Sequence, residues 1–88
     1  MHWRIGTHRL VEALHLALLI EEAILMALCD KEVELEVAPR ELHTACNGRP
    51  LAESDGLVLS SAIGQRIAAD DVLLQHISEA FVILVKKR

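Results

Sequence analysis

An apolar run near the N-terminus, residues 7–29, limits the folds open to this chain. Its sequence is THRLVEALHLALLIEEAILMALC, and apolar side chains recur through it at helical spacing. This predicts one helix of about six turns with Thr7 as its N-cap. Glutamates at positions 12, 21 and 22 make a membrane span too costly. Glu12 and His15 also interrupt the apolar region that a signal peptide would need, and Glu21-Glu22 fall where its cleavage site would begin. We therefore expect no membrane segment and place this helix in the core of a folded domain.

The size and composition of the chain predict one small domain, residues 1–88, that needs a partner. A chain of 88 residues buries only roughly 60–65% of its unfolded surface. Leu, Ile and Val supply 29 residues, whereas Trp3 and Phe81 are the only aromatic ones. A single small domain has difficulty burying so many aliphatic side chains, and a second subunit would bury more. We therefore expect a homodimer.

Strict alternation follows the first helix. Glutamates at 32, 34 and 36 alternate with Val33, Leu35 and Val37, and Pro39 closes the segment. This pattern predicts a half-buried strand near residues 32–38. A lone strand leaves its backbone groups unpaired, so it requires a second strand from this chain or from another subunit.

The remainder of the chain is predicted to be mostly helical. Residues 40–53 fit either a hairpin turning at Asn47-Gly48 or a short helix that ends there. Two helices are expected over residues 55–69 and 71–86, with Ser54 and Asp70 as N-caps. Residues 81–85 are also compatible with a strand. The predicted fold class is thus α+β, predominantly helical, with a long N-terminal helix, one short strand, two C-terminal helices and homodimeric packing.

Two charged residues fall on apolar helix faces. At 100° per residue, Glu21 lies on the apolar side of the first helix, and Arg66 lies near the centre of the apolar side of the helix over 55–69. A buried unpaired charge costs several kcal/mol, so we expect these two side chains to pair within a subunit or across a dimer. The alternative is that both reach solvent from the edge of the core.

The last helix carries a second apolar ridge besides its main face. Val72, His76 and Ile83 form this ridge, and a helix with two apolar sides usually has two packing partners. His76 is therefore predicted to be an interface residue. Together, Glu21, Arg66 and His76 are the predicted binding residues.

Two other groups of polar residues give only weak evidence for a metal site or a catalytic site. Glu12 and His15 lie three residues apart on one helix face, a spacing used in metal-binding bundles, but their stripe is polar and solvent is its simplest neighbour. His43 and Cys46 lack a recognisable orienting group for nucleophilic catalysis. We predict no catalytic residue, no metal site and no cofactor. Cys29 and Cys46 have no ligand or redox spacing, so we expect free thiols and a cytoplasmic location.

The formal charge of −4 argues against nucleic-acid binding, which usually requires a basic face. The resulting functional prediction is a homodimeric interaction or regulatory module, an adaptor or inhibitor, with an acidic surface at Glu32, Glu34 and Glu36. One alternative is a small-molecule binding domain with a pocket anchored by Glu21 and Arg66. Another is a helical metal-binding protein that uses Glu12 and His15.

Overall fold

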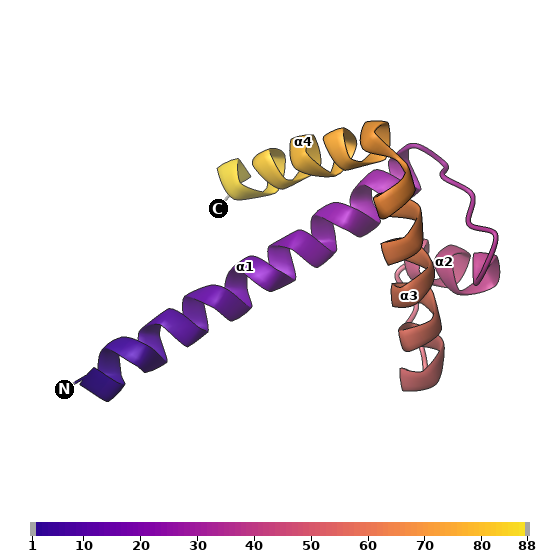
Figure 1. Cartoon of the computed structure of the whole chain (residues 1–88). Coiled ribbons are helices and arrows are strands. Elements are labelled where there is room, and N and C mark those ends of the chain that lie inside the picture. The colour runs from indigo at the N-terminus through magenta and orange to yellow at the C-terminus, as the bar shows by residue number, and fades with distance from the viewer. Residues whose placement is uncertain (1, 88) are drawn as a thin grey trace.

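Four helices connected by short segments make up the computed structural model of the chain (Figure 1). It describes the backbone of residues 2–87, and the side chains of residue 12 and of residues 14–87. The helices are α1 (His2–Asp30), α2 (Pro39–Cys46), α3 (Glu53–Ala69) and α4 (Asp71–Lys87). No strand forms within residues 2–87, so the predicted α+β class is wrong and the fold is all-helical.

The long first helix is confirmed and is longer than predicted. It begins at His2 instead of following an N-cap at Thr7, whose side chain lies outside the described residues. Figure 1 shows α4 running back along α1 from its C-terminal end and stopping about halfway. The N-terminal half of α1 therefore projects from the rest of the molecule.

The predicted strand near residues 32–38 is instead an irregular linker between α1 and α2. Its apolar alternation is only partly used, because Leu35 is buried while Val37 is exposed. Two residues with left-handed backbone, Glu32 (φ 50°) and Ala38 (φ 61°), lie near its two ends and interrupt an extended conformation. A strand also needs a neighbour for its backbone groups, and the described residues contain no second strand that could provide one.

Residues 40–53 follow the helical alternative, and the hairpin is wrong. Pro39 occupies the first turn of α2, where its missing N–H costs nothing. The helix ends at the predicted place, since Asn47 is the C-cap and Gly48 has φ 72°, which favours glycine. The Gly48 N–H donates to the Ala45 carbonyl at 3.0 Å and closes the end of the helix.

One of the two predicted N-caps for the C-terminal helices is confirmed. α3 begins at Glu53 after Ala52, so Ser54 lies inside the helix and is not its cap. Asp70 does cap α4, because its Oδ1 accepts a hydrogen bond from the Leu73 N–H at 3.1 Å. Residues 81–85 are helical, which excludes the strand alternative there.

The core is formed mainly between the C-terminal half of α1 and α4. Small side chains at the contact, Ala23 and Ala27 on α1 and Ala80 on α4, let the two helices approach closely. Leu28 and Leu73 are the largest side chains that are fully buried. α2 and α3 close one end of this pair through Leu42, Leu59 and Ala62.

The molecule is extended for its size. Its Cα radius of gyration is 14.8 Å, whereas a compact domain of this length has about 12 Å. The projecting half of α1 accounts for this difference, with a longest dimension of 48 Å against 28 and 24 Å. Within the described residues, no helix combines the length and the apolar character that crossing a membrane requires.

Candidate functional site

The most prominent surface feature is an aliphatic stripe on the projecting half of α1. Leu16, Ile20, Ala23 and Ala27 follow a 4-3-4 spacing, so they lie on one side of the helix. α4 buries Ala23 and Ala27 but leaves Leu16 and Ile20 about half exposed. The stripe that forms the core therefore continues past the end of α4 without a covering element.

The opposite side of the same segment is also apolar and exposed. Leu14 and Leu18 lie one turn apart there, and Leu18 is 59% exposed. Singly exposed leucines are ordinary on protein surfaces, but a contiguous group is typical of an interaction surface. The α1 segment of residues 14–20 is accordingly a candidate for contact with a second molecule.

α4 carries exposed aliphatic side chains on both sides of its core stripe. Val72 and Ile83 lie on one side, and Leu74 and Val85 lie on the other. The first pair belongs to the ridge predicted from the sequence. Nothing within the described residues covers it, as Val72 is 63% exposed.

Glu21 and Arg66 do not come together within the chain. Glu21 is exposed because it lies on the part of its apolar face that carries the exposed Leu14 and Leu18, whereas Leu28 at the C-terminal end of that face is buried. Arg66 forms its ion pair with Asp70 on the last turn of α3, with Nη2 3.4 Å from Oδ2. The intrachain pair is therefore wrong, and the alternative in which both side chains reach solvent describes this subunit.

His76 lies where the sequence placed it, at the edge between core and surface. Its side chain is 30% exposed, and its Nδ1 atom is buried without a hydrogen-bond partner among the described residues. The nearest acidic group is Glu79, whose Oε2 lies 3.8 Å from this nitrogen, too far for a hydrogen bond. The interface role of His76 stays a prediction.

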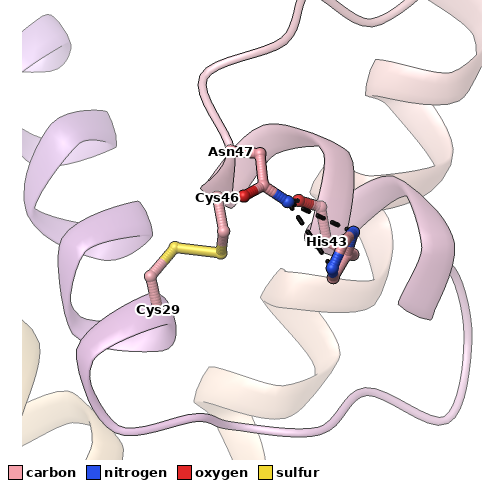
Figure 2. Close-up of a disulfide and its surroundings, with 4 residues drawn as sticks. All are labelled: Cys29, His43, Cys46 and Asn47. Atoms are coloured by element: carbon pink, nitrogen blue, oxygen red, sulfur yellow. Dashed lines mark hydrogen bonds between the residues drawn. A yellow bond between two sulfur atoms is a disulfide. The ribbon is translucent and has the colours of Figure 1, made fainter.

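A disulfide joins the ends of α1 and α2, which corrects the prediction of free thiols (Figure 2). Cys29 and Cys46 are 17 positions apart in sequence, and their Cα atoms lie 5.7 Å apart. Each cysteine lies at the C-terminal end of its helix. The sequence gives no signal for this pairing, because it depends on how the linker brings the ends of two helices together.

An open groove runs beside the disulfide. Its floor is aliphatic, with Leu28, Leu35 and Leu42, and Glu32 and Glu34 stand at its rim. His43 also lines it, and the Asn47 side-chain amide contacts this histidine, with Nδ2 3.3 Å from Nδ1 and donating to the His43 carbonyl at 2.9 Å. Figure 2 shows the His43 ring beside Asn47 and not beside the sulfur atoms.

This arrangement does not form a nucleophilic site. Asn47 supplies the orienting group that the sequence did not reveal, but Cys46 is oxidised and has no thiol to activate. The prediction that the chain has no catalytic residue stays a prediction.

The metal alternative gains no support from the described residues. Glu12 and His15 are both exposed, and no group of three or more His, Cys, Asp or Glu side chains within the described part of the chain could hold a metal ion. Arg66 does line a hollow together with Glu34 and Glu36, but Glu21 is not among its lining residues. No family model, curated protein or solved structure matches this chain.

Proposed function

We propose that this protein is a homodimeric interaction module whose exposed aliphatic surface on α1 and α4 contacts a second copy. The observation that carries the proposal is the accessible surface of the chain, 6895 Å². A compact monomer of 9.8 kDa exposes about 5,200 Å². The excess is roughly 1,700 Å², about twice the area that one partner contributes to a standard interface.

The character of the exposed surface supports the same proposal. Among the described side chains, twelve large aliphatic ones are at least 45% exposed, and they concentrate on the first and last helices. Burial of such side chains stabilises an interface by roughly 25 cal/mol per Å² before the costs of association. A second copy presents the same aliphatic surface and is the simplest partner for it.

The acidic linker is the part of the surface that we expect to face a different protein. Glu32, Glu34 and Glu36 are all exposed in the linker between α1 and α2, and Glu32 and Glu34 also line the groove beside the disulfide. Their charge favours a basic partner and disfavours nucleic acid. A cytoplasmic location forms no part of the proposal, because disulfides persist mainly in oxidising compartments.

Sedimentation velocity over a range of concentrations tests the homodimer. The expected species at about 100 µM is a dimer of twice the 9.8 kDa chain mass, dissociating on dilution toward micromolar concentrations. A chain that stays at 9.8 kDa throughout that range overturns the proposed function.

A further inference from the structure

The exposed ridge of α4 has a self-complementary chemistry. It consists of Val72, His76, Glu79 and Ile83, whose 4-3-4 spacing places them on one side of the helix. The ridge adjoins the core stripe but is separate from it, since Val72 and Ile83 are 63% and 45% exposed. An aliphatic residue stands at each end, and a histidine and a glutamate stand between them.

A second copy of α4 laid antiparallel on this ridge matches it residue for residue. About a two-fold axis between residues 77 and 78, Val72 meets Ile83 of the second copy, and His76 meets Glu79 of the second copy. Both contacts occur twice by symmetry. Two apolar pairs then flank two polar pairs, each a histidine facing a glutamate, which fixes the register as well as the direction of the helices.

The ends of α4 favour the same direction. The first turn carries Asp71, preceded by Asp70, and the last turn carries Lys86 and Lys87. Antiparallel packing brings the acidic end of each helix beside the basic end of the other, and it also opposes the two helix dipoles. A parallel arrangement would place like charges side by side at both ends.

The exposed part of the His76 ring gives the seam a specific polar contact. Nδ1 of His76 is buried in its own chain without a hydrogen-bond partner, while the side chain as a whole stays 30% exposed. Glu79 of the same chain is too distant to bond that atom, and its own side chain is 62% exposed. Because Nδ1 is buried within its own chain, a second copy does not reach that atom, and Glu79 of the second copy accepts a hydrogen bond from the exposed part of the ring instead.

We propose that two copies associate through an antiparallel seam formed by Val72, His76, Glu79 and Ile83 of each α4. This rests on the proposed homodimer and names its interface. The other side of α4 is the competing surface, with Leu74, Ser78, Phe81 and Val85 at the same spacing. That side carries no histidine–glutamate pair, so two copies packed through it would have no polar contact to fix one register of the helices.

A matched pair of substitutions distinguishes the two sides of α4. Ile83 and Val85 are both 45% exposed, and each is replaced by glutamate. In sedimentation equilibrium, Ile83→Glu is expected to raise the dimer dissociation constant about 100-fold, because it places a charge against Val72 of the second copy. Val85→Glu is expected to change that constant by less than about threefold.

The possible outcomes distinguish failure of the proposed seam from failure of the proposed homodimer. If the wild-type chain dimerises and Val85→Glu weakens it as much as or more than Ile83→Glu, the seam is wrong and the proposed function stands. If the wild-type chain is monomeric, the proposed function fails with it. Circular dichroism at 222 nm on each variant shows whether a loss of dimer reflects loss of helix.

Mixing two variants with exchanged charges tests the contact between His76 and Glu79 of the second copy, even where each variant alone dimerises weakly. His76→Glu places glutamate against Glu79 of the second copy, and Glu79→Lys places lysine against His76 of the second copy. Each variant alone is expected to dimerise at least about tenfold more weakly than wild type. Their equimolar mixture is expected to form a heterodimer tighter than either homodimer, because both contacts become complementary.

If His76 and Glu79 interact only within one chain, mixing the two variants does not restore association. A heterodimer no tighter than the two homodimers, measured by energy transfer between labelled variants, therefore overturns the seam.

Discussion

The two halves of residues 14–30 of α1, residues 14–21 and residues 22–30, have similar aliphatic compositions and very different surroundings. Both are rich in Leu, Ile and Ala, and both are helical. The C-terminal half packs on α4, ends at the disulfide, and contains Ala23, Ala27 and Leu28 at 3% exposure or less. The N-terminal half has the same aliphatic character at Leu14, Leu16 and Leu18, all more than half exposed. Apolar periodicity therefore predicts that a helix has a face to bury, but not whether its own chain covers that face.

The largest expected difference between the two halves is in the cost of truncating a leucine. Leu28→Ala is expected to lower the free energy of unfolding by about 3 kcal/mol, because it removes a fully buried side chain and leaves a cavity. Leu18→Ala, at a position 59% exposed, is expected to cost less than about 1 kcal/mol in the monomer. Urea denaturation at low protein concentration measures both. Equal losses would show that the N-terminal half is as well covered as the C-terminal half.

The second difference is the covalent anchor at the C-terminal end of α1. Replacing Cys29 and Cys46 together by serine is expected to cost about 3 kcal/mol, the chain entropy of a loop closed over 17 positions. α2 has only eight residues and buries only Leu42 deeply, so it is too short to persist without support. Hydrogen exchange should show lost protection in α2, with the α1 and α4 contact retained.

The reduced wild-type chain is the control for the serine pair, since it opens the same bond without changing the side-chain volume. An unchanged urea midpoint in both would mean that packing alone holds α2 in place.

The smallest expected difference comes from enlarging an alanine. Ala23→Leu is expected to cost about 1–3 kcal/mol, because Ala23 has no exposed surface and lies at the close approach of α1 to α4. Ala17→Leu is the matched control on the exposed half, and alanine and leucine have similar helix propensities. It should change thermal stability by less than about 0.5 kcal/mol. A comparable loss at Ala17 would indicate that a neighbouring element covers that position too.

Much of the secondary structure was predictable from local signals. The long first helix, the Asp70 cap and the end of a helix at Asn47-Gly48 depend on side-chain groups and backbone angles within a few residues. The predicted strand failed for a nonlocal reason. Alternation at residues 32–38 describes which side chains prefer burial, whereas a strand also requires a neighbouring strand, which the described residues do not contain.

The candidate site was predicted only in part. The α4 ridge with His76 followed from helical spacing, because its geometry depends on one helix alone. The intrachain pairing of Glu21 with Arg66 required the relative placement of two helices, and here Arg66 pairs instead with Asp70, four residues away. The disulfide was missed because it joins the ends of two helices whose proximity depends on the linker between them.

The sequence by itself thus determined an aliphatic, helical chain with more apolar surface than a small domain can bury. Only the tertiary structure decided where that surface lies. α4 has 17 residues and α1 has 29, so α4 can cover only about half of α1 after the chain reverses direction. Leu14, Leu16, Leu18 and Ile20 of α1 and the outer ridge of α4 are exposed because no other element of the described chain covers them.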